Sequence, residues 1–318
     1  MLDILLSRLA QLVVVLVGVS FLTFFMLNLL PGDPAVATLG DDATPEALAS
    51  FRAEHDLDRP VLTRYLTWAG GAVTGDLGQS YRNDRDVLDT IVDRVPVSLE
   101  LVVIAQVISL ALAIPAALLA VWKRNTIVDR ALSMSAFAGL SIPSFLLAFL
   151  LILVFAVQLN WLPASGFTRI SEGFGDNLRT ALLPALTLSL SQYSVYMRLL
   201  RSEMIETLGN EYITTAYGKG LGVRRILVRH VMRNSLFSMI TVIGVNIGVL
   251  LGGAVITESI FAIPGIGRLL IDSISQRDLM MVQGVVLFVA VTYVVINLLV
   301  DLSYTLLDPR IRHGSRAE

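Results

Sequence analysis

The sequence predicts an all-α membrane protein with six transmembrane helices and a large extracytoplasmic loop between the first and second of them. Two observations predict this class. Hydrophobic residues make up 55% of the 318 residues and charged residues only 16%, whereas soluble proteins carry about 25% charged residues. In addition, the chain contains several charge-free runs as long as the roughly 20 residues that a helix needs to cross the hydrocarbon core.

Six charge-free runs give the predicted spans. The first run is longer than the roughly 7–15 residues of a signal-peptide core, so an uncleaved helix is predicted over residues 1–30 although Ala35, Val36 and Ala37 resemble a cleavage site. The third run begins after Arg130 and is too long for one helix, so the Trp, Pro and Gly of residues 161–166 are expected to end it. The remaining runs lie within residues 101–122, 179–198, 233–258 and 278–301.

The basic residues fall on one side of this six-helix arrangement. Residues 123–130, residues 198–234 and the tail 308–318 are rich in Arg and Lys, whereas the loop 31–95 on the other side is acidic. Because cytoplasmic connections carry the excess of Lys and Arg, both termini are predicted to be cytoplasmic. Within the loop, Thr44 followed by Pro45 predicts a helix start. This structured loop is either a lid over the outer mouth or a docking site for an external partner.

The composition also excludes several kinds of site. The chain has no cysteine, and therefore no disulfide or thiolate metal site. Its three histidines, His55, His230 and His313, are scattered and predict no metal cluster. The chain lacks the GxxxxGK[ST] loop that would hold the phosphates of ATP. We therefore expect no catalytic, metal or cofactor site.

The polar, basic segment 198–234 lies between two predicted spans and must project into water, because lipid cannot satisfy its backbone and charges. A short helix is predicted from Asn210 to Lys219, and Gly220 is expected to end it because glycine tolerates the left-handed conformation of a helix stop. An apolar face on this helix would suit a groove on a partner protein. The residues predicted on that face are Tyr212, Ile213, Ala216 and Tyr217.

Three arginines, Arg224, Arg225 and Arg229, follow on a second predicted helix. They would pair with carboxylates of the same partner. The alternative is a basic patch that rests against anionic lipid, as juxtamembrane arginines do.

Four residues are candidates for a pathway or gate across the membrane. Glu258 and Phe261 lie at the outer end of the fifth run. A carboxylate in a membrane helix costs about 2.5–3.5 kcal/mol on insertion scales, so Glu258 either faces a cavity or is satisfied by backbone groups at the helix end. Gln192 and Asn246 are uncharged polar residues within spans. They either line the path or form interhelical hydrogen bonds.

Five groups of motifs, which together run along nearly the whole chain, resemble the permease subunits of binding-protein-dependent ABC importers of the dipeptide and oligopeptide type. The coupling-loop motif of that superfamily is matched by Thr214, Thr215, Ala216, Tyr217 and Gly220, although Thr214 replaces its initial acid. The other motifs lie in residues 75–81 (GDLGQSY), 161–166 (WLPASG), 258–267 (ESIFAIPGIG) and 307–312 (LDPRIR), with residues 221–234 continuing the coupling loop.

The resemblance implies a type I ABC importer permease fold, with a transmembrane domain over residues 96–307 and a cytoplasmic coupling loop over residues 198–234. It also implies a second homologous permease, two ATPase subunits that use ATP and Mg²⁺, and an extracytoplasmic substrate-binding protein. The implied function is import of di- or oligopeptides across the cytoplasmic membrane by alternating access. Alternatives are the same machinery with another small solute (a nickel chelate, glutathione or an opine) or an ATPase-independent secondary transporter.

Overall fold

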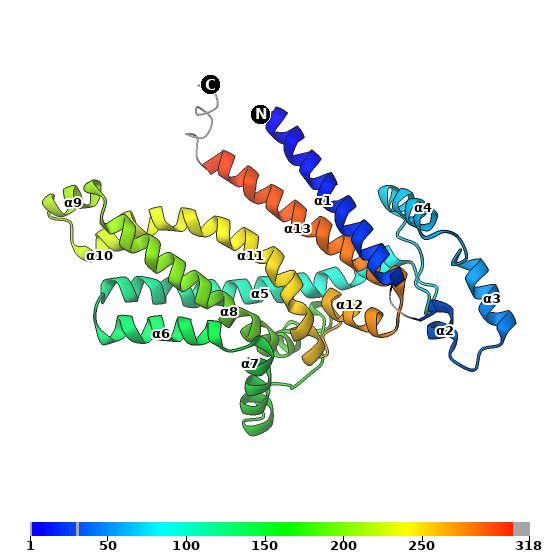
Figure 1. The fold of residues 1–318 in the computed structure, drawn as a ribbon. Coiled ribbons are helices and arrows are strands. Elements are labelled where there is room, and N and C mark those ends of the chain that lie inside the picture. Colours follow the sequence, from blue (N-terminus) through cyan, green and yellow to red (C-terminus); the bar gives the residue numbers. More distant parts are fainter. Residues whose placement is uncertain (1, 30–31, 308–318) are drawn as a thin grey trace. The chain divides into compact units, whose positions relative to one another are not determined.

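The computed structural model describes residues 2–29 and 32–307, and all the regular elements of this part are helices (Figure 1). The chain divides into two compact units, and each is described by itself. Unit 1 comprises Met1–Ser98 with Pro264–Leu298, and unit 2 comprises Leu99–Ile263 with Leu299–Glu318. The predicted cytoplasmic tail, residues 308–318, lies outside the described residues.

Four helices are long and apolar enough to cross a membrane, and the number rises to five if one bent helix pair counts as a span. They confirm the all-α membrane class. The apolar stretch is Leu12–Leu29 in α1 (Leu2–Leu29) and Leu279–Val300 in α13 (Leu279–Leu307). In α5 (Val87–Trp122) it covers the whole helix. The fourth stretch, Val223–Leu250, runs from α10 (Val223–Arg225) into α11 (Met232–Ile260).

The bent pair replaces the single third helix that the charge-free run predicted. α6 (Ile127–Ser141) is followed by α7 (Ser144–Leu151) and a π-helix (Ile152–Gln158), and the two halves meet at 104°. The break falls at Pro143, which has no N–H to donate and which disfavours the helical conformation of the residue before it. Ile142 is accordingly extended, with φ −86° and ψ 119°.

α8 (Phe174–Leu208) contains the predicted fourth span but is not one of the four apolar helices. Its central part carries Ser189, Gln192 and Ser194, and all three are buried inside unit 2. A helix whose polar side chains face protein does not need the apolar surface that a lipid-facing helix needs. Helical segments therefore lie at the six predicted positions, although the third is the bent pair and α8 is not apolar enough to count as a candidate span.

The loop of unit 1 that the sequence predicts to be extracytoplasmic contains α2 (Pro34–Leu39), α3 (Pro45–Glu54) and α4 (Val61–Thr74). The predicted start of α3 is confirmed, since Thr44 Oγ1 accepts the N–H of Ala47 at 3.2 Å and Pro45 occupies the first turn. Asp33 caps α2 and is bound by the guanidinium of Arg52. Partial burial raises the pKa of Asp33, but the hydrogen bonds from Arg52 and from the Ala35 N–H outweigh burial and lower it below its usual value.

α5 (Val87–Trp122) begins earlier than the apolar pattern indicated, so the last part of the predicted loop 31–95 is helical. Asp86 starts it by accepting the N–H of Asp89 at 3.0 Å through its side chain. A side-chain cap of this kind allows a helix to extend beyond its apolar stretch.

A buried carboxylate joins the loop of unit 1 to the start of α13. Asp278 is 4% exposed, and its Oδ1 accepts the N–H groups of Tyr81 and Met281, both at 3.2 Å, while its Oδ2 accepts the hydroxyl of Ser80. Asp278 thus caps α13 and also fixes a segment almost two hundred residues away in sequence. The core beside it includes Phe24, Tyr65 and Trp68.

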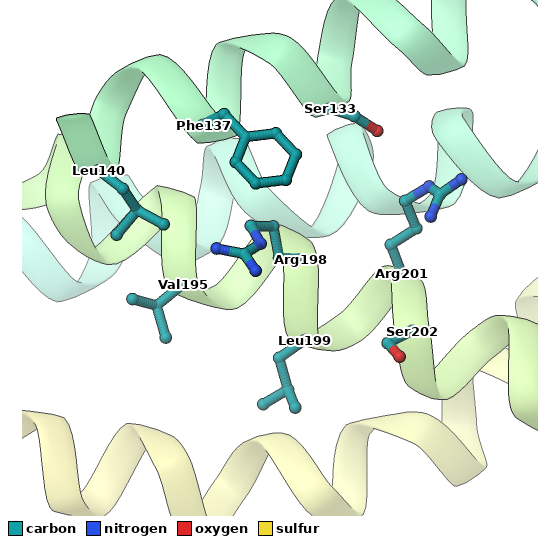
Figure 2. Close-up of a pocket in the computed structure, with 8 residues that line it drawn as sticks. All are labelled: Ser133, Phe137, Leu140, Val195, Arg198, Leu199, Arg201 and Ser202. Atoms are coloured by element: carbon teal, nitrogen blue, oxygen red, sulfur yellow. The ribbon is translucent and has the colours of Figure 1, made fainter.

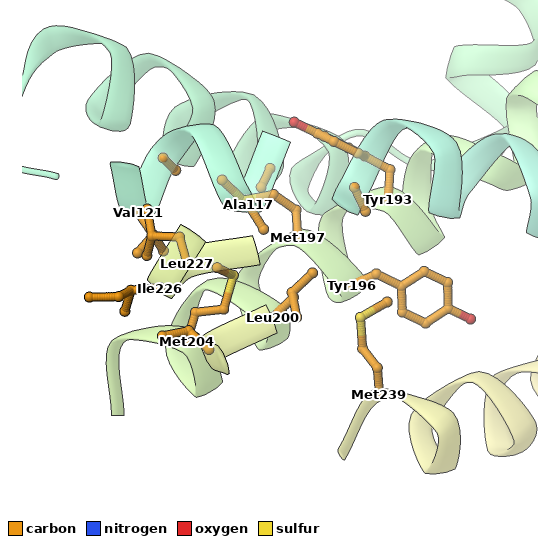
Figure 3. Packing of buried hydrophobic residues seen from close by; sticks show 14 of the residues in the cluster. Ala117, Val121, Tyr193, Tyr196, Met197, Leu200, Met204, Ile226, Leu227 and Met239 are labelled. Carbon is orange, nitrogen blue, oxygen red and sulfur yellow. The ribbon is translucent and has the colours of Figure 1, made fainter. Parts of the chain in front are cut away.

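The core of unit 2 is built from α5, α6, α8 and α11 (Met232–Ile260). Figure 3 shows its centre, where Ala117 and Val121 of α5 meet the large side chains of α8 and Met239 of α11. Ile226 and Leu227 enter the same core from the segment that precedes α11. The polar segment predicted to project into water is therefore anchored in the centre of this unit.

Candidate functional site

The segment 198–234 is helical along most of its length. α8 continues to Leu208, and then come α9 (Glu211–Gly218), α10 (Val223–Arg225) and a π-helix (Ile226–Val231) that leads into α11. Asn210 stands at the predicted N-cap with extended backbone, but its side chain makes no cap hydrogen bond. The predicted short helix is present, with an uncapped start.

Gly220 ends α9 as predicted. Its φ is +77°, the N–H of Gly220 binds the carbonyl of Tyr217 at 2.9 Å, and the N–H of Leu221 binds the carbonyl of Ala216 at 3.3 Å. These two bonds form a Schellman motif, in which a left-handed residue closes the helix and the next residue packs back onto it. Leu221 does pack against the core cluster that contains Ala216.

We expect Gly220→Ala to destabilise the turn by about 1–2 kcal/mol, because an L side chain is strained in the left-handed conformation. An added Cβ would meet no atom within 4 Å, so conformation alone sets the cost. The measurement is the rate of tryptic cleavage after Lys219, which should rise about tenfold. Gly222→Ala is the matched control, since Gly222 has φ −68° and equally open surroundings. Equal cleavage rates in the two variants would contradict the role of Gly220.

The structure divides the predicted apolar face of α9. Ile213 is 1% exposed and Ala216 is 7% exposed, and both pack into the core of unit 2. Tyr212 and Tyr217 are 46% and 44% exposed. The prediction that all four form one free face is therefore wrong for Ile213 and Ala216. These two side chains pack into the core of the chain itself, and only the two tyrosines remain in solvent.

The other residues predicted to act with this helix lie on the outside of the segment. We call those of the predicted partner-contacting residues that are exposed the coupling surface. It consists of Tyr212, Thr214, Thr215, Tyr217, Gly220, Arg224, Arg225 and Arg229. Ile226 and Leu227 lie between Arg225 and Arg229 in the sequence and are buried. The surface thus carries two aromatic rings and three cations, and the buried residues next to them hold its backbone against the core of unit 2.

The predicted path residues Gln192 and Asn246 belong to a buried polar cluster within unit 2. The hydroxyl of Tyr196 donates to Oε1 of Gln106 at 3.1 Å, and the side chain of Asn246 lies near this hydroxyl. Gln192 lies one helical turn before Tyr196 on α8 and is 6% exposed. One amide atom each of Gln106, Gln192 and Asn246 has no partner. The cluster therefore brings together polar side chains of α5, α8 and α11 inside unit 2.

Glu258 and Phe261 are buried at the end of α11, with 0% and 1% exposure. The carbonyl of Glu258 accepts the N–H of Ile263 at 2.8 Å, and the carbonyl of Phe261 accepts that of Gly166, also at 2.8 Å. Gly166 has φ +97°, a conformation that favours glycine. The two residues thus hold the turn after α11 and attach residues 161–166 to it.

An ion pair that sequence reasoning missed joins α6 to α8. Arg201 donates from Nε to Oδ1 of Asp129 at 2.8 Å and from a terminal nitrogen to Oδ2 at 3.0 Å. Asp129 is 3% exposed. The available signal was a single acid in an otherwise basic connection, residues 123–130. Its partner is distant in sequence, so only the packing of the two helices identifies it.

Comparisons with known proteins match the chain along its length. Residues 109–313 match the family described as "Binding-protein-dependent transport system inner membrane component", and residues 1–102 match "Binding-prot-dependent transport system membrane comp, N-term". Among the residues that the structure describes, no group of three or more His, Asp or Glu side chains lies close enough together to hold a metal ion.

Individual relatives agree with this family. A putative peptide transport system permease protein of Brucella abortus is 39% identical over 98% of this chain and 99% of its own length. The dipeptide transport system permease protein DppB of Escherichia coli is 38% identical, also over 98% of this chain and 99% of its own. A crystal structure of an amino acid ABC transporter aligns with a TM-score of 0.50 at 15% identity, over 70% of this chain and 94% of that one, and this likeness concerns the fold alone.

The family match, the two full-length relatives and the helical membrane fold agree with one another. The chain therefore belongs to the family of binding-protein-dependent transport system inner membrane components, as a permease subunit of an ABC importer and not as an enzyme.

Proposed function

We propose that this chain forms half of a membrane pathway that imports di- or oligopeptides, and that it pairs with a second, homologous permease and two ATPase subunits. An extracytoplasmic binding protein would deliver the peptide. The names of the relatives, which refer to peptide and dipeptide transport, support this cargo. The observation that carries the coupling role is the structure of α9, which is exposed on one side and buried in the core of unit 2 on the other.

Tyr212 and Tyr217 are the proposed anchors of the ATPase contact. Exposed tyrosines next to arginines are typical of interface hot spots, since both types are enriched there. Arg224, Arg225 and Arg229 would pair with carboxylates of the ATPase subunit. In this proposal Thr214 and Thr215 border the contact, whereas Ile213 and Ala216 act indirectly by holding α9 in the core.

The buried side of α9 would transmit the motion. Ile213 and Ala216 share one packed cluster with residues of α5, α8 and α11, such as Val121, Leu200 and Met239. A close-packed core deforms little, so a displacement of α9 would move the ends of these helices with it. ATP-driven closure of the ATPases would open the pathway outward to receive peptide, and hydrolysis would return it to the inward-open state.

The buried polar cluster is the proposed lining of the pathway. A peptide backbone needs hydrogen-bond partners that do not select particular side chains, and Gln192 and Asn246 each carry an unpartnered amide atom. Glu258 and Phe261 would act as the gate at the outer end of α11, where they hold the turn that binds Gly166.

In the proposed topology the protein spans the inner membrane and both of its termini lie in the cytoplasm. Residues 1–30 form the first span, residues 31–95 lie outside with α2, α3 and α4, and residues 96–307 form the transmembrane domain, followed by the tail 308–318. The basic segments on the inner side support this orientation. The external loop would face the binding protein or cover the outer mouth.

Tyr217→Glu should reduce peptide-stimulated ATP hydrolysis of the assembled complex at least tenfold. The change removes an aromatic anchor and adds a charge to the contact, which we expect to weaken ATPase association by about 2 kcal/mol or more. The measurement is ATP turnover in proteoliposomes with and without peptide-loaded binding protein.

Ile127→Glu serves as the control, because Ile127 is 82% exposed at the start of α6 and lies outside the coupling surface. Normal stimulation in the Tyr217 variant would refute the coupling role. Transport by this chain alone, driven by an ion gradient without ATPase subunits, would refute the importer itself. Peptide binding by the cognate binding protein would separate peptides from nickel chelates, glutathione and opines.

A further inference from the structure

A groove in unit 2 lies between α6 and α8, outside the coupling surface and the polar cluster. It has a volume of about 520 Å³ and is lined by Ser133, Phe137, Leu140, Val195, Arg198, Leu199, Arg201 and Ser202. Figure 2 shows that its two ends differ: Ser133, Arg201 and Ser202 lie at one end, and Leu140 and Val195 at the other, with Arg198 and Phe137 between them. The groove is therefore amphiphilic along its length.

Arg198 supplies the available charge in this groove. Its guanidinium carbon lies 4.7 Å from the centre of the Phe137 ring, a cation–π contact that orients the group. Among the described residues no carboxylate lies within ion-pair distance of Arg198, whereas Arg201 is paired with Asp129. With the charge of Arg201 compensated by Asp129, the groove carries one net positive charge and matches a ligand with a single negative charge.

The position of Arg198 along α8 indicates the depth at which the ligand lies. Residues 180–197 are free of charge, and Arg198 is the first charged residue toward the basic segment 198–234. Arg201 and Ser202 lie at the end of the groove nearer this basic segment, and Val195 lies at the other end, within the charge-free stretch. In the proposed topology, on which this inference rests, Arg198 lies at the depth of the lipid phosphates of the cytoplasmic leaflet, where basic pockets between helices bind lipid head groups.

We propose that this groove binds one anionic glycerophospholipid of the cytoplasmic leaflet, with its phosphate on Arg198 and an acyl chain along Phe137, Leu140 and Val195. The chemistry that recognises it is a phosphodiester with one negative charge joined to a hydrocarbon chain. Phe137 and Leu140 are 54% and 45% exposed, so the groove offers the acyl chain an open apolar wall. The bound lipid covers the seam between α6 and α8 beside the Arg201–Asp129 pair.

The test uses the purified, assembled complex and native mass spectrometry with phosphatidylglycerol added to the micelles. Arg198→Gln should weaken binding of one phosphatidylglycerol molecule about fivefold, since a cation near the lipid surface contributes about 1 kcal/mol. Arg198→Lys should retain most of the binding, and Phe137→Ala should weaken it. Arg130→Gln is the matched control, because Arg130 is exposed near the start of α6 but does not line the groove. Unchanged melting temperatures confirm that the variants fold.

Competition identifies the ligand. Phosphatidylcholine, whose phosphate charge is cancelled by its own cation, should displace phosphatidylglycerol poorly, and inorganic phosphate should not displace it at all. Equal binding to wild type and Arg198→Gln would overturn the proposal. So would displacement by inorganic phosphate, which indicates a free anion site, or by dialanine, which indicates a cargo carboxylate. Loss of the second permease from the Arg198→Gln complex would assign the groove to the subunit interface and also overturn it.

Discussion

Arg201→Ala is expected to destabilise unit 2 by about 3 kcal/mol, the lower end of the cost of removing one partner of a buried ion pair, because the Arg201 side chain is 28% exposed. The change leaves the carboxylate of Asp129 buried at 3% exposure. The carboxylate would still accept the N–H of Asn125, which lies 3.1 Å from its Oδ2. One neutral donor does not replace a bidentate guanidinium, whose two charge-assisted bonds are the stronger kind. Because the pair joins α6 to α8, the core between these helices should loosen.

The measurement is the melting temperature of the purified protein in detergent. Arg130→Ala is the control, because it removes an exposed arginine from α6. The double variant Asp129→Asn with Arg201→Gln should recover much of the loss, because neither side chain is then an uncompensated charge. If Arg201→Ala and Arg130→Ala melt at the same temperature, the ion pair does not stabilise the unit.

Asp278→Ala is expected to destabilise unit 1 by about 3–4 kcal/mol, since hydrogen bonds to a charged group contribute about 1.5–3 kcal/mol each and their partners are left buried. The variant would leave the N–H groups of Tyr81 and Met281 and the hydroxyl of Ser80 without their acceptor. Both the first turn of α13 and the loop segment around Ser80 would lose their attachment. Hydrogen exchange should therefore accelerate in both segments together, although they are far apart in sequence.

Asp272→Ala is the matched control. Asp272 lies on α12 (Ile266–Ser275), its side chain is 52% exposed, and its ion pair with Arg268 is 3.5 Å long. Such an exposed pair contributes about 0–1 kcal/mol. In a double-mutant cycle, Ser80→Ala should cost little once Asp278 is already alanine. Faster exchange at α13 with an unchanged segment around Ser80 would show that Asp278 acts only as a helix cap.

Local chemistry made several elements predictable. Thr44 followed by Pro45 identified the start of α3, and Gly220 identified the end of α9, because each depends on a few neighbouring backbone groups. The charge-free runs located the membrane helices for a similar reason, since a span must be apolar over its own length. The bend at Pro143 was missed because the apolar run continues through it and hides the break.

The partners of side chains were not predictable from the sequence. Ile213 and Tyr212 are neighbours that the sequence places on one face of the helix, yet one is buried in the core and the other is 46% exposed. Which side of α9 turns inward depends on the cluster formed by α5, α8 and α11. Likewise, the sequence showed an acid at Asp129 and an arginine at Arg201, but their pairing depends on how α6 packs against α8.

By itself the sequence determined the membrane class, the approximate places of the apolar helices and the basic segment that must lie in water, since each follows from the solvent that a local stretch of chain requires. The tertiary structure alone decided which polar groups meet. These are the hydrogen bond from Ser80 to Asp278, the Arg201–Asp129 ion pair and the cluster around Tyr196. The physical reason is that hydrophobic burial acts on composition and periodicity, which are local, whereas hydrogen bonds and ion pairs require two groups within about 3 Å of each other.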